Sequence, residues 1–278
     1  MPSSAAGIYY EERGTGGDHL VWIHGFGSST RGHQGLVEAF GDYHSILIDL
    51  PGFGRSAAAG NDCRIPALAA AAHSVLDELG IDQYSVIGAS MGGGVALRMA
   101  LDRPEAVRTV IGIVPFPAQG VIDDGTEAMS AAMARLHGNS EALRLAYAAT
   151  SKNPPMAAID NLVEDSCSAN VDAWTDWLTG GGSKFSQFDE LGSLSVPVCS
   201  IIGADDIVLS VADQLATAAR VPRGRAIVLS GVGHLMWAED PQRVIDEIRA
   251  SVDLLGADNR VAVSCCAPQS EEGATTDC

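Results

Sequence analysis

Short β-rich apolar runs alternate with helix-period stretches along most of this chain, and this alternation limits the possible folds more than any other feature of the sequence. Helical periodicity separates most of the runs, which is the pattern of parallel strands joined by crossover helices. The sequence therefore predicts an α/β fold class, with a mostly parallel central sheet and helices on both of its faces. The predicted strands cover residues 8–12, 20–24, 45–49, 84–88, 107–114, 196–203 and 226–229.

Three of the predicted helices have recognisable ends or apolar stripes. Apolar residues recur at three- and four-residue spacing over 65–79, and Gly80 stops this helix as a left-handed C-cap. A second helix is predicted over 211–220. The third covers 241–255, where Asp240 is a suitable N-cap and a proline occupies the first helical position. The apolar stripes of the first and third helices can cover the sheet.

The alternation of strands and helices is interrupted between residues 116 and 194. This stretch has few β-branched runs and two helical patterns, at 127–137 and 142–149. In open α/β sheets ligands bind at the carboxyl ends of the strands, so we expect a helical cap over that end and place the substrate pocket beneath it. The predicted domains are an α/β core of residues 1–115 and 195–256, a helical cap insert at 116–194, and a polar, flexible C-terminal tail at 257–278.

Acidic residues outnumber basic residues by about two to one, with 35 Asp and Glu against 17 Lys and Arg and a net charge of −18. Such a surface repels phosphate backbones and anionic lipids, so neither nucleic acid nor a membrane is expected as a partner. No apolar run approaches the ~20 residues of a transmembrane helix, and the N-terminus lacks the basic and apolar regions of a secretory signal. These features predict a cytoplasmic protein and leave its oligomeric state open.

Metal and cofactor motifs are missing from the sequence. The six cysteines lack the CxxC spacing of a zinc site or a redox motif, and neither HExxH nor another cluster of His and carboxylate residues occurs. No G-x-G-x-x-G follows a predicted strand, so no dinucleotide is implied. We therefore expect no metal and no cofactor, and a small-molecule substrate as the partner.

A G-x-S-x-G pattern, Gly88-Ala89-Ser90-Met91-Gly92, lies between a predicted strand and a predicted helix. In a strand–turn–helix elbow the serine occupies a sharp, strained turn, and the flanking glycines let the strand and the helix approach closely. Ser90 is therefore the predicted nucleophile. The backbone N–H of Met91 lies at the positive end of the helix dipole, where it would stabilise a developing oxyanion.

A second oxyanion donor is expected from the loop that follows residues 20–23. Its sequence is His24-Gly25-Phe26-Gly27-Ser28-Ser29, and the two glycines allow the backbone to fold tightly against the elbow. The N–H of Phe26 can then point into the same hole as the N–H of Met91. We expect His24 itself to be a structural, hydrogen-bonded residue.

A serine hydroxyl needs a general base, and that base needs an acid to orient it. Of the seven histidines only His234 lies in a Gly-rich turn, directly after a C-terminal strand and before the last helix. The predicted strand 196–203 is followed by Asp205 and Asp206, and this argument leaves either carboxylate as the partner of His234. The chain order is Ser, Asp, His, which is the order of one large hydrolase fold.

Five segments carry a resemblance to a known family: HGFGSS at 24–29, DLPGFGRS at 49–56, GASMGG at 88–93, GADDIVLS at 203–210 and GVGHLMWAEDP at 231–241. They occur in the order found in the α/β-hydrolase superfamily, which the chain resembles from residue 8 to residue 255. The resemblance implies an α/β-hydrolase fold with an inserted helical cap.

The resemblance also implies roles for individual residues. Ser90 would be the nucleophile, His234 the base and Asp206 the acid, because the family's G-x-x-D segment puts the carboxylate three residues after the glycine. Phe26 and Met91 would form the oxyanion hole. Family members with aspartate at the elbow are haloalkane dehalogenases and epoxide hydrolases, and a serine there argues against both.

With a serine nucleophile, the resemblance implies a carboxylic ester hydrolase, lactonases included, that works through an acyl-enzyme. Other serine-triad members of the fold are carbon–carbon bond hydrolases and cofactor-free perhydrolases or haloperoxidases, and a non-catalytic ligand receptor is a further alternative. A carbon–carbon hydrolase would need a cationic or polar group beside the site, for which Arg31 and Arg98 are candidates. The apolar residues expected near the substrate are Phe116, Met129, Met156, Trp174, Trp177, Met236 and Trp237.

Overall fold

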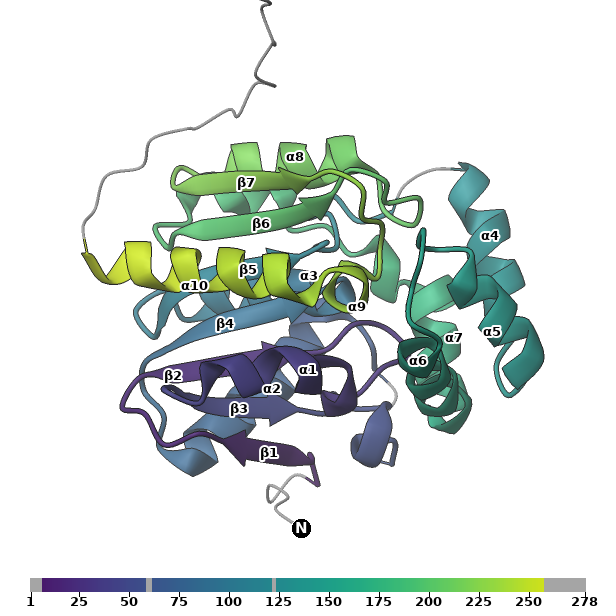
Figure 1. Cartoon of the computed structure of the whole chain (residues 1–278), viewed down its shortest axis with the longest axis horizontal. Coiled ribbons are helices and arrows are strands. Elements are labelled where there is room, and N and C mark those ends of the chain that lie inside the picture. Colours follow the sequence, from purple (N-terminus) through teal and green to yellow (C-terminus); the bar gives the residue numbers. More distant parts are fainter. Residues whose placement is uncertain (1–6, 59–61, 122–123, 258–278) are drawn as a thin grey trace, which may run out of the picture.

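A seven-stranded sheet forms the centre of the protein (Figure 1). It is seen in a computed structural model that describes residues 7–58, 62–121 and 124–257, so the tail predicted at 257–278 lies outside the described residues apart from Ala257. The strand order is β1-β3-β2-β4-β5-β6-β7. The strands are β1 (Tyr10–Arg13), β2 (His19–Ile23), β3 (His44–Ile48), β4 (Tyr84–Ala89), β5 (Val107–Ile113), β6 (Val198–Gly203) and β7 (Gly224–Leu229).

All neighbouring strands run parallel except β1, which pairs antiparallel with β3. Strand β3 lies between β1 and β2 in the sheet, although only residues 14–18 join β1 to β2 along the chain. A link of that length can cross the ~10 Å of two strand spacings but cannot hold the helix that a parallel crossover needs. The predicted strand ends differ from the observed ones by at most two residues, and the predicted α/β class with a mostly parallel sheet is confirmed.

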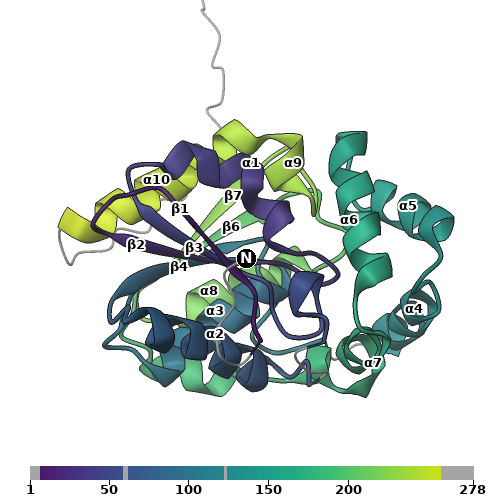
Figure 2. The same cartoon turned by 90° about the horizontal axis from the view of Figure 1, so that it is seen from below.

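Helices cover both faces of the sheet. Figure 2 shows α1, α9 and α10 on one face and α2, α3 and α8 on the other. The helix predicted at 65–79 is α2, which ends at Gly80 in the left-handed conformation (φ 68°). The bounds are α1 (Gln34–Val37), α2 (Ile65–Leu79), α3 (Met91–Asp102), α8 (Val211–Arg220), α9 (Met236–Glu239) and α10 (Pro241–Ala257).

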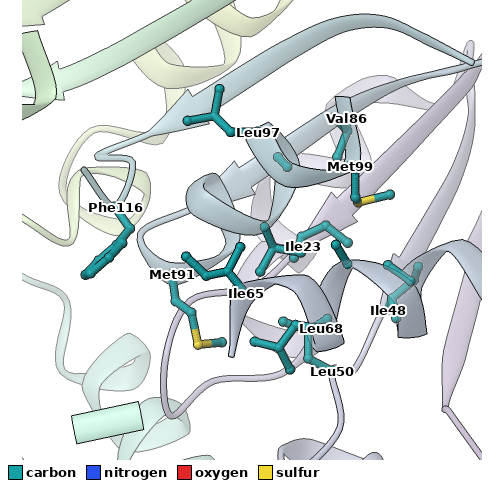
Figure 3. Close-up of a cluster of buried hydrophobic side chains, with 14 of the residues drawn as sticks. Ile23, Ile48, Leu50, Ile65, Leu68, Val86, Met91, Leu97, Met99 and Phe116 are labelled. Carbon is teal, nitrogen blue, oxygen red and sulfur yellow. The ribbon is translucent and has the colours of Figure 1, made fainter. Parts of the chain in front are cut away.

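Two hydrophobic clusters lie under these helices, and the alternating side chains of the strands divide between them. Val21 and Ile23 of β2 belong to the cluster that includes Leu68 of α2. Leu20 and Trp22 of the same strand belong to the second cluster, under α1 and α10. In Figure 3, side chains from α2 and α3 lie around Ile23. Because both faces of the central strands are buried, the sheet is a rigid base for the loops at its ends.

The segment between β5 and β6 is mainly helical and lies beyond one end of the sheet (Figures 1 and 2). The patterns at 127–137 and 142–149 correspond to its first two helices, while its other two helices were not predicted. This segment also contains short 3₁₀ or π helices at Asp176–Gly180, Gly182–Lys184 and Phe188–Ser193. Three further 3₁₀ helices lie in the first part of the chain, at Thr30–His33, Glu38–Phe40 and Gly54–Ser56. The helices of the segment are α4 (Asp124–Ala134), α5 (Ser140–Ala148), α6 (Met156–Ser168) and α7 (Val171–Thr175).

The described helices include none that is both long and apolar enough to cross a membrane.

A buried histidine makes the stability of the fold depend on pH. His33 is 2% exposed and packs against the Trp22 ring with 5.6 Å between centroids. Burial and the neighbouring His24 ring lower the pKa of His33 to about 4. Since an unfolded histidine titrates near ~6.5, protons bind the unfolded chain first, and stability is lost as the pH falls from about 6.5 towards 4.

We expect this histidine to lower the unfolding free energy by about 2 kcal/mol between pH 7.5 and pH 5.0. Urea unfolding of the wild type and of His33→Gln at both pH values measures the effect. The variant should lose about 2 kcal/mol less than the wild type over this interval. Other buried groups titrate in both proteins, so equal losses in the two would contradict the account.

Candidate active site

Ser90 occupies the turn between β4 and α3 in a strained backbone conformation. Its φ and ψ are 50° and −118°, in a region that residues other than glycine rarely adopt. Hydrogen bonds hold the turn: the Ser90 N–H donates to the Ile113 carbonyl at 3.0 Å, and the Ser90 carbonyl accepts from the N–H groups of Gly93 and Phe116, both at 2.8 Å. Ser90 is half-buried. The predicted elbow geometry is therefore present.

The glycines on either side of Ser90 permit the close approach of strand and helix. A Cβ added at Gly88 would lie 2.1 Å from the Gly92 carbonyl oxygen, and one at Gly92 would lie 2.2 Å from the Ile23 carbonyl oxygen. No real Cβ contact is that short, so any larger residue would push α3 away from β4 and β2. The requirement for glycine at both positions follows from backbone packing.

The structure brings His234 and Asp206 together with Ser90. The loop after β7 places His234 Nε2 at 3.1 Å from Ser90 Oγ. The other ring nitrogen, Nδ1, lies 3.1 Å and 3.0 Å from the two carboxylate oxygens of Asp206, in the loop after β6. A carboxylate only accepts, so Nδ1 donates to Asp206 and Nε2 is left as the basic nitrogen facing the Ser90 hydroxyl.

Asp206 is buried, with no exposed side-chain surface, and it is surrounded by donors. Burial alone raises the pKa of its carboxyl. The hydrogen bond from His234 and the electrostatic attraction between the two groups, together with the N–H groups of Leu209 and Val208, outweigh burial and hold the pKa below its ordinary value. The amide of Gln214 donates to the second carboxylate oxygen at 3.2 Å. Asp206 is therefore held as an anion behind the imidazole.

Asp205, the other carboxylate that the sequence left open, faces away from this arrangement. Its side chain is 44% exposed and lies 3.3 Å from Lys152 Nζ. Of the two adjacent aspartates, the one hydrogen-bonded to His234 is Asp206.

The loop that carries Phe26 packs directly against the elbow. Gly25 lies against Ala89 and Ser90, and the Ser28 N–H donates to the Gly25 carbonyl at 3.3 Å, which closes a four-residue turn with Phe26 in its second position. The hydrogen bond that closes such a turn leaves the N–H of the second residue unused. This N–H is therefore left available for a ligand.

His24 holds the start of this loop. Its Nδ1 donates to the Gly25 carbonyl at 2.7 Å, and its Nε2 accepts from the Leu50 N–H at 2.9 Å. Burial lowers the pKa of His24, in keeping with a neutral ring. Both ring nitrogens are thus bonded to the backbone, as expected for a structural histidine.

Three of the aromatic residues predicted near the substrate form one group of rings with the Phe26 side chain. The Trp174 and Trp177 rings lie 4.4 Å and 6.2 Å from the Phe26 ring, and the Phe116 ring lies 5.0 Å from Trp177. We call Phe26, Phe116, Trp174 and Trp177 the aromatic cluster. These contacts join the insert, the elbow region and the loop that carries Phe26.

The predicted methionines lie elsewhere. Met236 is fully buried in the hydrophobic cluster under α1 and α10, on the other face of the sheet from the aromatic cluster. Met129 and Met156 are 54% and 52% exposed. Trp237 packs near His234, with 6.2 Å between ring centroids. The structure therefore does not bring Met236 to the aromatic cluster, because Met236 begins helix α9 and its side chain packs into the core on that face.

The helical segment also contacts the His234 loop, through residues that the sequence analysis did not single out. The Thr150 carbonyl accepts from the His234 N–H at 3.3 Å, and Ser151 Oγ accepts from the Leu235 N–H at 2.7 Å. These contacts join distant parts of the chain, so no local pattern could have indicated them.

A cleft of about 300 Å³ opens next to the Phe26 loop and the His234 loop, and neither Ser90 nor His234 lines it. Ser28, of the loop that carries Phe26, and Leu235, next to His234, contribute to its wall. Its remaining lining includes Leu36, Leu162 and Trp237, and the polar residues Arg31 and Asp165. Within the described residues, no group of three or more His, Cys, Asp or Glu side chains is placed to hold a metal ion.

Comparison with known proteins agrees with this fold. A model of the alpha/beta hydrolase family matches residues 20–247. The chain is 28% identical over 247 residues to a 2-hydroxy-6-oxononadienedioate/2-hydroxy-6-oxononatrienedioate hydrolase of a Pseudomonas species. The aligned region covers 84% of this chain and 86% of that protein. It is 27% identical over 253 residues to a pimeloyl-acyl-carrier-protein methyl ester esterase of Aeromonas hydrophila, with 85% and 96% covered.

A solved structure shows the same fold. An esterase of Exiguobacterium antarcticum superposes with a TM-score of 0.79 at 19% identity, covering 88% of this chain and 95% of that one.

Proposed function

Because the chain belongs to the α/β-hydrolase family, we propose that it is a serine hydrolase that cleaves carboxylic ester or lactone bonds of small to medium, partly apolar substrates. One observation carries this proposal: Ser90 Oγ lies 3.1 Å from His234 Nε2, and Asp206 lies 3.0 Å from the opposite ring nitrogen. A strained serine, a base and a buried acid in this order are the parts that acyl transfer requires.

In the proposed mechanism His234 removes the hydroxyl proton of Ser90 as Oγ attacks the substrate carbonyl. The tetrahedral oxyanion accepts hydrogen bonds from the N–H groups of Phe26 and Met91, the latter at the N-terminus of α3, where the helix dipole adds to the stabilisation. Protonated His234 then gives its proton to the leaving alcohol. A water activated by the same imidazole hydrolyses the acyl-enzyme and restores Ser90.

We propose that the helical segment at 116–194 is a cap and that it shapes the substrate site. The aromatic cluster packs against the Phe26 side chain with tilted and edge-on rings, which makes the region beside this loop apolar. The cleft of about 300 Å³ is lined by Ser28 and Leu235, neighbours of the Phe26 and His234 loops, and by apolar residues of α6, while Ser90, His234 and the aromatic cluster lie outside its lining. The apolar surroundings of the Phe26 loop favour a substrate with one apolar part.

A carbon–carbon bond hydrolase remains the second candidate, because the Pseudomonas relative is named for a dienedioate substrate. Such a dianion needs a cation to hold a carboxylate. Arg31 already lies 3.0 Å from Asp165 and 3.1 Å from Glu164, and Arg98 lies 2.7 Å from Asp102. Since both candidate cations are paired with carboxylates, we favour the ester or lactone.

A substrate panel separates these candidates. We expect turnover of p-nitrophenyl esters and acyl lactones with an optimum at short or medium chains, and turnover of a 2-hydroxy-6-oxo-dienoate at least 100-fold slower in kcat/KM. The panel spans acyl chains from two to twelve carbons, and the chain-length optimum measures the depth of the pocket. A dienoate preferred over every ester would reject the ester proposal, and binding without turnover of any member would indicate a receptor.

A further inference from the structure

Helix α6, which lies outside the α/β core, forms hydrogen bonds with the loop that carries Phe26. Ser166 Oγ donates to the Gly27 carbonyl at 2.8 Å, and Ser29 Oγ donates to Asp165 Oδ2 at 2.7 Å. Both α6 side chains are buried, with 0% exposure for Ser166 and 7% for Asp165. Two consecutive residues of the helical segment thus hold the residues that directly follow Phe26.

The hydrogen bonds at Ser166 have a defined direction. The Gly27 carbonyl can only accept, so it takes the single hydroxyl proton of Ser166. The Tyr147 hydroxyl lies 2.6 Å from Ser166 Oγ and must therefore donate to it. Tyr147 is 6% exposed, and burial raises its pKa, so the phenol keeps the proton that it donates. The chain of donors runs from Tyr147 through Ser166 to Gly27, and each bond polarises the next.

The held carbonyl belongs to the turn that presents the Phe26 N–H. Gly27 occupies the third position of the Gly25–Ser28 turn with φ 67°, and a Cβ there would lie 2.6 Å from Ser166 Oγ. The serine hydroxyl fills the space that a side chain would need. Phe26 and Gly27 are the two central residues of one closed turn, so an anchor on the Gly27 carbonyl restricts the backbone rotations that would redirect the Phe26 N–H.

We propose that Ser166, with Tyr147 behind it, is a positioning residue for the oxyanion hole: it acts from the cap, through the Gly27 carbonyl, on the N–H of Phe26. This inference rests on the proposed function. It assigns to the inserted segment a part in transition-state stabilisation in addition to shaping the substrate site. A donor that is displaced by a fraction of an ångström loses much of its effect in the transition state and little in substrate binding.

Kinetics of Ser166→Ala and Tyr147→Phe test the role. The matched control is Ser168→Ala on the same helix, because the Ser168 hydroxyl bonds to the helix backbone at Glu164 and Asp165, both at 3.0 Å. The readouts are kcat and KM for p-nitrophenyl butyrate, the rate of inactivation by a fluorophosphonate, whose oxygen occupies the oxyanion hole, and the urea midpoint.

We expect kcat of Ser166→Ala to fall about 10-fold with KM changed less than two-fold, and the inactivation rate to fall in parallel. Tyr147→Phe keeps the bond to Gly27 and should show a smaller fall in the same two quantities. Ser168→Ala should match the wild type.

A lower urea midpoint for Ser166→Ala with an unchanged kcat per folded site would show a purely structural role and overturn the inference. Where Ser166→Ala does not fold, Tyr147→Phe decides, and wild-type kinetics in that variant would overturn it. Failure of the proposed function is a separate outcome: the wild type itself would neither turn over any ester nor be labelled by the fluorophosphonate. That result would also remove the positioning role.

Discussion

Replacing Ser90 by alanine is expected to lower kcat/KM for the best ester of the panel by three or more orders of magnitude. The change removes the atom that would form the acyl-enzyme and leaves the base, the acid and the oxyanion donors in place. A residual rate above that of water is expected, because the oxyanion hole and the binding site persist. The measurement is the initial rate of p-nitrophenolate release by the purified variant.

The matched control is Ser74→Ala, whose hydroxyl donates to the Ala71 carbonyl within α2 at 2.7 Å. It should keep the wild-type rate within about two-fold, because the hydroxyl touches neither the elbow nor the insert. Ser90→Ala should also fold as well as the wild type, since the side chain is small and half-buried. An unchanged rate in folded Ser90→Ala would mean that another group is the nucleophile.

Replacing Asp206 by asparagine is expected to lower kcat by about four orders of magnitude. The amide cannot hold the proton on His234 Nδ1 as the carboxylate does, so the basic nitrogen no longer faces Ser90 in the required tautomer. The adjacent Asp205→Asn is an unusually close control. Its carboxylate is exposed and pairs with Lys152, so kcat should change by less than about two-fold.

The charge of Asp206 also predicts a feature of the pH profile. Because its pKa lies below the ordinary value of an aspartate, Asp206 stays ionised near neutral pH, and it should contribute no inflection to the rate there. The measurements are kcat for both variants, and for the wild type the dependence of kcat on pH. Equal losses in Asp205→Asn and Asp206→Asn would contradict the assignment of the acid.

The α/β core could be predicted because its signals are local. Apolar spacing and a terminal glycine predicted the helix at 65–79, and the structure places α2 at these residues. The antiparallel direction of β1 was not specified, because it depends on which strand β1 finds as its neighbour. Pairing across the sheet is a property of the tertiary structure, and a short link allows it without changing any local pattern.

Helix α6 was not predicted because two of its buried residues are polar. Asp165 and Ser166 interrupt the apolar stripe that marks a core-facing helix, although both are buried. Their partners are Ser29 and Gly27, on a loop more than a hundred residues earlier in the chain. A polar residue can be recognised as buried only when its hydrogen-bond partner is known, so apolar periodicity alone predicts an exposed helix here.

The choice between Asp205 and Asp206 shows the same limit at the site. Both carboxylates follow one strand and both are chemically able to orient an imidazole. The sequence pattern of the family favoured Asp206, and in the structure the side chain of Asp206 is 0% exposed while that of Asp205 is 44% exposed. Adjacent residues of a loop point in different directions, and only the three-dimensional path of the backbone separates them.

Covalent labelling tests the central claim, that Ser90 is the activated nucleophile, most directly. The wild type is incubated with a fluorophosphonate at pH 8, and the adduct is located by intact-protein and peptide mass spectrometry. We predict a single adduct on the peptide that contains Ser90, absent from Ser90→Ala and formed at least 100-fold more slowly in Asp206→Asn. No adduct on the folded wild type, or an adduct on any other residue, would contradict the account.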